Sequence, residues 1–336
     1  MTSLAVSAAV FAVSLAVLLA SAEAFTRSAE RIGIGLGISP FVVGATVVAA
    51  GTSLPELSAS VIAGLAGEPG IVVGNVVGSN VANVLLVLGT TAAVAGRIDV
   101  DRELMRVDLP LLVASAGFLW LALADGAFAW YEGVLALAGL AIYLEFVISD
   151  IYRLEETVED VLEDVTGSPI DVDPQAPRDP ERLAGDVSFG AGTVVVAVVA
   201  ILAVFASANY LVESILDVAV AVGVGSEVVA ITAVSVGTSL PEIGVSVAAV
   251  RQGNADIAIG NVLGSNVFNT FAVMGVPSIL APVTVPASVV RYALPAMLLA
   301  TALYFFIAQD REITRYDGFA LLLLYGTFLA NLFAFV

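Results

Sequence analysis

The chain has 336 residues, of which 59% are hydrophobic and only 13% are charged, and its mean hydropathy is +1.01. Because about a quarter of the residues in an average soluble domain are charged, this composition excludes a soluble globule and indicates a membrane protein with several spans. The chain has no Cys and no His, which excludes disulfides, thiolate chemistry and an imidazole base.

The net charge is −19, from 31 acidic residues against 12 basic ones, all of which are Arg. Most of the acids lie between the apolar stretches, which indicates a solvated acidic surface, and this balance argues against nucleic acid as a partner. Without Cys and His, a metal site has to use oxygen ligands, which suit hard ions such as Na⁺, Ca²⁺ or Mg²⁺.

Ten apolar stretches follow one another along the chain, each close to or above the length of about 20 residues that a membrane-spanning helix needs. The first five are residues 4–22, 33–66, 71–94, 107–124 and 128–149. The second five are residues 188–208, 226–250, 257–280, 289–308 and 316–335. Residues 209–225, which carry two acids, are expected to extend the sixth span obliquely.

An acidic segment with four prolines, residues 151–187, separates the two groups of five spans. We therefore predict an all-α polytopic membrane protein with ten transmembrane helices. One five-helix repeat covers residues 1–150 and the other covers residues 188–336. Of the 12 arginines, 11 fall in alternate connections, and Arg291 alone falls in the others. The positive-inside rule then predicts a cytoplasmic linker at 151–187 and external termini, and we expect the protein in the cell membrane.

The two halves share a long internal repeat. Residues 51–89 align without a gap with residues 237–275, and 21 of the 39 aligned positions are identical. The repeated segments begin on the second and seventh spans, five crossings apart, so equivalent helices are predicted to run in opposite directions. Inverted repeats of this kind form binding sites near the middle of the membrane, where broken helices meet, and they transport by alternating access.

Each copy of the repeat begins with Gly-Thr-Ser-Leu-Pro-Glu. Pro55 and Pro241 lack an N–H group and clash with the preceding turn, so they are expected to kink their helices and to free a main-chain carbonyl. Glu56 and Glu242 follow directly, inside apolar spans that hold no basic residue. A charge in hydrocarbon costs about 2.5 to 3.5 kcal/mol on insertion scales, so we predict that the two carboxylates bind a cation.

Neutral oxygen atoms recur around these acids at helical spacing. Thr52 and Thr238 lie four residues before the glutamates and so share a helix face with them. Further hydroxyl and amide oxygens come from Ser79, Ser265, Asn83 and Asn269. Ca²⁺ takes about 6 to 8 oxygen ligands, and this set can supply them. Two carboxylates balance the charge of one Ca²⁺ or of two Na⁺.

At these residues the chain resembles the sodium/calcium exchanger family of the Ca²⁺:cation antiporter superfamily. The signatures G-T-S-x-P-E and G-N-x-x-G-S-N-x-x-N/D occur in both halves, within residues 44–95 and 230–281. The resemblance implies a Na⁺/Ca²⁺ antiporter and not an enzyme, in which helices 1 and 6 slide over a core of eight helices. It implies no cofactor apart from the transported ions, and we expect the protein to act as a monomer in the lipid bilayer.

The resemblance also implies roles for particular residues. Glu56 and Glu242 would be shared Na⁺ and Ca²⁺ ligands, assisted by the carbonyls and hydroxyls of Thr52 and Thr238. The outer cation positions would be lined by Ser53, Ser79, Ser239 and Ser265. Main-chain oxygens would come from Ala49 and Ser235.

One position departs from the family pattern. The family commonly has Asp at the last motif position of the second repeat, where this chain has Asn269, matching Asn83 of the first repeat. The centre of the site therefore has one ionisable group fewer, which leaves the driving ion open. The alternative reading is a proton-coupled exchanger of Ca²⁺ or another divalent cation. A cation channel and an intramembrane enzyme with two carboxylates fit the kinked, inverted motif less well.

Overall fold

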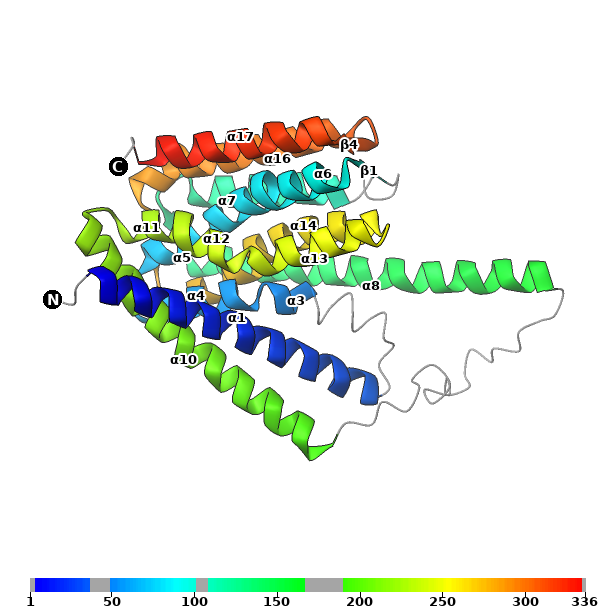
Figure 1. The fold of residues 1–336 in the computed structure, drawn as a ribbon, viewed down its shortest axis with the longest axis horizontal. Helices are drawn as coiled ribbons and strands as arrows, with labels where there is room; N and C mark the ends of the chain where they lie inside the picture. The colour runs from blue at the N-terminus through cyan, green and yellow to red at the C-terminus, as the bar shows by residue number, and fades with distance from the viewer. Residues whose placement is uncertain (1–3, 37–48, 101–107, 167–189, 334–336) are drawn as a thin grey trace.

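The structure is a computed structural model that describes residues 4–36, 49–100, 108–166 and 190–333. Helices make up nearly all of the described residues, and they form a bundle (Figure 1). Seven of the described helical segments are long and apolar enough to cross a membrane. They are Leu4–Gly35, Pro69–Ala95, Trp130–Val147, Ala191–Val222, Ser226–Arg251, Ile257–Leu280 and Val289–Ala308.

The first half of the chain contains seven α-helices and one π-helical segment among its described residues. In chain order they are α1 (Leu4–Gly35), α3 (Ala49–Thr52), α4 (Leu54–Leu65), α5 (Pro69–Ala82), the π-helical segment η2 (Asn83–Val87), α6 (Leu88–Ala95), α7 (Leu109–Leu123) and α8 (Trp130–Thr166). Two short strands, β1 (Arg97–Asp99) and β2 (Ala127–Phe128), lie in its connections.

The second half repeats this order. Its described helices are α10 (Ala191–Val222), α11 (Ser226–Val229), η4 (Ala230–Val234), α12 (Ser235–Thr238), α13 (Leu240–Arg251), α14 (Ala255–Phe268), η5 (Asn269–Val273), α15 (Gly275–Leu280), η6 (Val289–Ala293), α16 (Leu294–Ala308) and α17 (Arg315–Leu332). The short strands are β3 (Val283–Thr284) and β4 (Glu312–Thr314). Shifting the first half by 186 residues brings α5, η2 and α7 onto α14, η5 and α16 within one residue.

Each of the ten predicted spans contains helix, although only seven of the described segments are both long and apolar enough to cross a membrane. The apolar helices α4 and α7 are shorter, and α17 begins with a charged turn. That all ten cross the membrane therefore stays a prediction.

Some boundaries differ from the sequence expectation: α1 continues to Gly35, and α8 runs unbroken to Thr166, so the first part of the predicted linker is helical. The expected extension of the sixth span is confirmed, because α10 continues to Val222.

The connections contain short β-ladders, which an all-α expectation did not include. Strand β1 pairs antiparallel with β4, and β2 pairs antiparallel with β3, so both ladders join the two halves of the chain. Beside the first ladder, Arg97 bonds to Asp99 and to Glu312, each at 2.9 Å. The hydrogen bond and charge of Asp99, together with the charge of Glu312, raise the pKa of the Arg97 guanidinium.

The segment from α5 to α6 is the most buried of the seven candidate spans. Glycines let it approach the second half closely: a Cβ added to Gly74 would lie 2.7 Å from the Glu227 carbonyl oxygen and 2.9 Å from Ala230 Cβ. On one side of the bundle, α1 packs along α10, and the two helices diverge toward the ends where α1 finishes and α10 begins (Figure 1). The Ser7 hydroxyl donates to Asp217 at 3.3 Å and links them.

Candidate cation-binding site

The helices that carry the repeated motif break where the sequence predicts a kink. Helix α3 ends at Thr52 and α4 begins at Leu54, and α12 and α13 are interrupted in the same way at Ser239. In both cases the proline occupies the first turn of the second helix, where its missing N–H needs no partner. The break places each glutamate in the first turn of the new helix, at the end where the helix dipole favours negative charge.

Two glutamates lie together in the interior. Glu56 on α4 and Glu242 on α13 are each 1% exposed, and they are near enough for their charges to repel. The Thr238 hydroxyl lies beside the Glu56 carboxylate, although it donates its hydrogen bond to the Val234 carbonyl at 3.1 Å. None of the four carboxylate oxygens accepts a hydrogen bond from the described residues. Two buried and unpartnered acids of this kind are costly unless a cation joins them.

Two asparagines are buried in an equivalent way. Asn83 and Asn269 are at most 1% exposed, and neither side-chain amide has a hydrogen-bond partner among the described residues. Each begins a π-helical segment, η2 or η5, in which the backbone turn is wider than in an α-helix. Helix α4 contacts η5, and α13 contacts η2. The fold therefore brings the acid-bearing helix of each half against the asparagine-bearing segment of the other half.

The predicted serine ligands divide into two groups. The hydroxyls of Ser53, Ser79 and Ser239 are buried and have no partner among the described residues, and Ser265 is 3% exposed. Ser235 differs, because its hydroxyl donates to the Ala230 carbonyl at 2.8 Å and its carbonyl accepts from the Ser239 N–H at 3.1 Å. A carbonyl has two lone pairs, so the predicted main-chain contribution of Ser235 is compatible with this bond.

The remaining two predicted ligands lie at the broken helix of the first half. Thr52 is half-buried at the end of α3, where it lines a cavity. Ala49 is the first residue of α3, and its side chain lies outside the described part of the chain. Neither placement tests its role as a ligand, so both roles stay predictions.

Sequence reasoning missed a pair of asparagines that hold the acid-bearing helices. The Asn75 amide on α5 donates to the Glu56 carbonyl at 3.0 Å and to the Ser60 hydroxyl at 2.9 Å. The equivalent Asn261 on α14 donates to the Glu242 carbonyl at 3.3 Å and to the Ser246 hydroxyl at 3.0 Å. These bonds fix the main chain of both glutamates. The signal in the sequence was that the asparagine, the glutamate and the serine each recur 186 residues later in the chain.

The asparagine of the Gly-Ser-Asn motif has a different environment in each half. The Asn80 amide donates to the Thr270 hydroxyl at 3.1 Å, which joins α5 to η5. The Asn266 amide instead donates to the Val262 carbonyl of its own helix at 2.6 Å. The internal duplication is therefore not perfectly symmetric at this motif.

The chemistry of the site is that of oxygen donors around two acids. Within the described ranges, no three His, Cys, Asp or Glu residues gather as a metal-binding group. The donors are instead two carboxylates with hydroxyl and amide oxygens, a set that hard cations prefer. Two formal negative charges suit one divalent cation or two monovalent cations, so the same residues can bind either kind.

A cavity of about 580 Å³ lies beside the broken helices. One wall is the second half of α1, including Glu23, Arg27 and Glu30, and the opposite wall includes Thr52 and the two motif prolines. Glu23 and Arg27 form an exposed ion pair on α1. Each motif proline directly precedes a glutamate in sequence, although neither glutamate itself lines the cavity.

Comparison with known proteins gives matches along nearly the whole chain. The family described as sodium/calcium exchanger protein matches residues 6–149 and 192–334. The chain is 31% identical to the sodium/calcium exchanger MaX1 of Methanosarcina acetivorans, over 95% of this chain and 96% of that protein. It is 33% identical to the putative antiporter CaxA of Alkalimonas amylolytica, with 93% of each chain covered.

A solved structure is similar over the same length. The sodium–calcium exchanger NCX_Mj, soaked with 2.5 mM Na⁺ and 10 mM Sr²⁺, matches with a TM-score of 0.63 and 27% sequence identity. The match covers 98% of this chain and 99% of that one. The similarity therefore includes the whole bundle and is not confined to the repeated motif.

Proposed function

The chain belongs to the sodium/calcium exchanger family, and from this premise we propose that it exchanges Na⁺ for Ca²⁺ across the membrane in which it is embedded. Both ions would use the site between Glu56 and Glu242. The observation that supports this most strongly is the burial of two neighbouring carboxylates, none of whose oxygens has a hydrogen-bond partner among the described residues. Because this is a family of transporters, we propose no enzymatic activity.

The ligands proposed for the ions are the residues that meet around these acids. Glu56 and Glu242 would bind both Na⁺ and Ca²⁺, with amide oxygens from Asn83 and Asn269. The other proposed ligands are Thr52, Thr238, Ser53, Ser239, Ser79, Ser265 and the main chain of Ala49 and Ser235. No cofactor is proposed, since the transported ions are the substrates, and the protein would act as a monomer.

The proposed topology is two inverted five-helix repeats, residues 1–150 and 188–336, joined by a cytoplasmic linker at 151–187. The matching order of elements in the two halves supports the repeats. The two β-ladders support them as well, because β1 of the first half corresponds to β3 of the second and β2 corresponds to β4, so the β1–β4 ladder is the counterpart of the β2–β3 ladder. Ten crossings leave both termini outside the cell, with the arginine-rich connections in the cytoplasm. The proposed location is the cell membrane.

Exchange would occur by alternating access. Carboxylates without a counter-ion are costly to enclose away from water, so the gate would close only on a loaded site, and empty crossings would be suppressed. Helices α1 and α10 are the proposed moving pair, because they pack together along one side of the bundle. The cavity beside α1 would be the path to the cytoplasm, because it lies along the half of α1 that carries Arg27 and Arg31 and arginines mark the cytoplasmic side.

Ca²⁺ uptake into proteoliposomes tests the proposal. Parent protein should take up ⁴⁵Ca²⁺ when the vesicles are loaded with Na⁺, and Glu56→Gln and Glu242→Gln should each abolish that uptake. Glu145→Gln is the matched control, because Glu145 is an exposed acid on α8, whereas both site glutamates are buried. Full uptake by either site variant would refute the proposed ligands.

The same vesicles distinguish the rival driving ion. Na⁺, K⁺ and H⁺ gradients are imposed one at a time, with the membrane potential clamped by an ionophore. Uptake driven by the Na⁺ gradient alone supports the proposal. Uptake driven by a pH gradient without Na⁺ would instead assign a proton-coupled exchanger, in which the same two carboxylates carry protons.

A further inference from the structure

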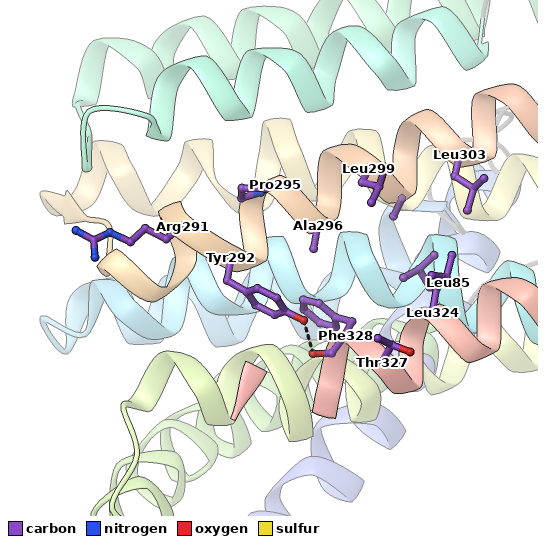
Figure 2. Close-up of a pocket in the computed structure, with 11 residues that line it drawn as sticks. Leu85, Arg291, Tyr292, Pro295, Ala296, Leu299, Leu303, Leu324, Thr327 and Phe328 are labelled. Carbon is purple, nitrogen blue, oxygen red and sulfur yellow. Dashed lines mark hydrogen bonds between the residues drawn. The ribbon is translucent and has the colours of Figure 1, made fainter. Parts of the chain in front are cut away.

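A second hollow lies on the far side of the molecule from the α1 cavity, between α16 and α17. It has a volume of about 310 Å³, and its lining is mostly apolar. Leu299 and Leu303 of α16 and Leu324 of α17 form its walls, and the buried Leu85 of η2 lies between them (Figure 2). We call this hollow the α16–α17 groove. It is open on one side, where Leu299 is 69% exposed.

An aromatic pair and an arginine lie at the same end of the groove. Near the start of α16, the Tyr292 hydroxyl donates to the Phe328 carbonyl at 2.9 Å, and the two rings stack with centroids 5.5 Å apart. Arg291 precedes this pair and is exposed, and Figure 2 shows its side chain extending away from the groove wall. Arg291 makes no ion pair with any residue in the described part of the chain.

Arg291 is also the exception in the charge pattern of the whole sequence. The other 11 arginines fall in alternate connections, at the opposite membrane surface by the span count. A lone cation at a membrane surface, beside an apolar groove, is complementary to the phosphate of a lipid headgroup.

The length of the groove matches one leaflet of a bilayer. From Arg291 to Leu303 the chain advances 12 helical residues, which at about 1.5 Å each is roughly 18 Å. Half of the hydrocarbon thickness is about 15 Å. A lipid whose phosphate lies at Arg291 would therefore lay its acyl chain along the groove and end near Leu303, at the middle of the membrane.

We propose that the α16–α17 groove binds one acyl chain of an anionic phospholipid, whose phosphate pairs with Arg291. A helix from a second copy of the chain fits less well, because a helix about 10 Å wide and 18 Å long occupies roughly 1,400 Å³. The groove volume is only about 310 Å³. Tyr292 and Phe328 would contact the part of the acyl chain nearest to the phosphate at Arg291.

Native mass spectrometry of the purified full-length protein tests the site. Phosphatidylglycerol and phosphatidylcholine with identical acyl chains are added at equal concentration, and the lipid retained after detergent removal is counted. The parent should retain phosphatidylglycerol in preference. We expect Arg291→Gln to lower its retention about fivefold, a change that corresponds to about 1 kcal/mol for one surface cation. Ala296→Phe, which fills the groove from α16, should lower retention of both lipids.

Matched variants control for charge and bulk. Arg251→Gln removes an exposed arginine elsewhere, and Ala330→Phe adds a ring to an exposed face of α17 that does not line the groove. Both should retain lipid like the parent, and thermal unfolding of every variant confirms that it is folded. Equal retention of the two lipids by the parent would overturn the proposal, as would an equal loss in Arg251→Gln. A dimer mass that Ala296→Phe abolishes would also overturn it, since a second copy would then be the occupant.

Discussion

At the scale of single residues, the site depends on polar atoms that the fold buries without a partner. Glu56 and Glu242 supply negative charge, while Asn83 and Asn269 supply only neutral oxygens. A buried polar group with no partner costs about 1 to 3 kcal/mol, and several such groups in one place are difficult to explain as packing alone. Two predictions follow from the difference between charged and neutral ligands and from the bonds that position the charged ones.

The first concerns the position where this chain departs from its family. Asn269→Asp adds a third acid to the centre of the site, so protons should compete more strongly with the transported ions and the ratio of Na⁺ to Ca²⁺ should change. Ca²⁺ binding itself should persist, since both glutamates remain. Coupling ratios and pH profiles of ⁴⁵Ca²⁺ flux measure this, and curves identical to those of the parent would contradict it.

The second concerns Asn75, whose amide donates to the main-chain carbonyl of Glu56 and so positions that residue. Asn75→Ala removes two hydrogen bonds and leaves a buried carbonyl and hydroxyl without that donor, so the glutamate backbone should lose its position. We expect the Ca²⁺ concentration for half-maximal uptake to rise roughly tenfold, the equivalent of about 1.4 kcal/mol, with a smaller change in maximal rate.

The control for this effect is Asn209→Ala. Asn209 is exposed on α10, and its amide donates to Glu213 of the same helix at 3.0 Å. This variant should transport like the parent. A fall in maximal rate alone for Asn75→Ala, with unchanged half-saturation, would show that Asn75 is merely structural.

At the scale of elements, the two halves meet where small residues let helices approach. In the described structure, α5 lies against η4 and α11 through Gly74, and a Cβ there would meet the Glu227 carbonyl oxygen at 2.7 Å. Close approach of this kind is how helices associate in lipid, where burial of apolar surface gives no driving force. The same contact brings the broken helix of the second half toward the core of the first.

Gly74→Ala should therefore destabilise the protein by about 1 to 3 kcal/mol, because the clash involves main-chain atoms that cannot rotate away. Gly326→Ala is the matched control, since Gly326 is exposed on α17 and no described atom lies within 4 Å of an added Cβ. It should not destabilise the protein. Thermal unfolding midpoints in one detergent compare the two, and equal midpoints would contradict the expectation.

At the scale of the whole molecule, transport requires α1 and α10 to move relative to the remaining helices. Helix α1 passes close to the broken helix of the first half, where a Cβ added to Gly51 would lie 2.8 Å from Thr26 Cβ. At the other end of α1, Ser7 bonds to Asp217 of α10. The first contact should break during transport, and the second should persist.

Disulfides test this difference, because the native chain has no Cys. Thr26→Cys with Gly51→Cys should link α1 to α3 after oxidation once the two helices move apart by about 1 Å, because a Cβ at Gly51 would lie 2.8 Å from Thr26 Cβ and bridged Cβ atoms lie about 3.5 to 4.5 Å apart. The link should stop Ca²⁺ flux until a reductant is added. Ser7→Cys with Asp217→Cys is the comparison pair between α1 and α10, at positions whose side-chain oxygens lie 3.3 Å apart, and its oxidation should leave flux intact. Unimpaired flux in the oxidised Thr26–Gly51 pair would rule out sliding of α1 over α3.

The sequence by itself determined the class of protein, the duplication and the chemistry of the candidate site. Hydropathy, two prolines and two acids within apolar runs sufficed, because charge and chain breaks in a membrane span are costly wherever the span lies.

Only the tertiary structure decided which helices meet: α4 with η5, α13 with η2, and Asn75 with the carbonyl of Glu56. It also revealed the β-ladders and the α16–α17 groove. The physical reason is that a membrane helix is apolar on its lipid-facing side as well as on its packed side, so hydropathy does not indicate which face contacts which neighbour.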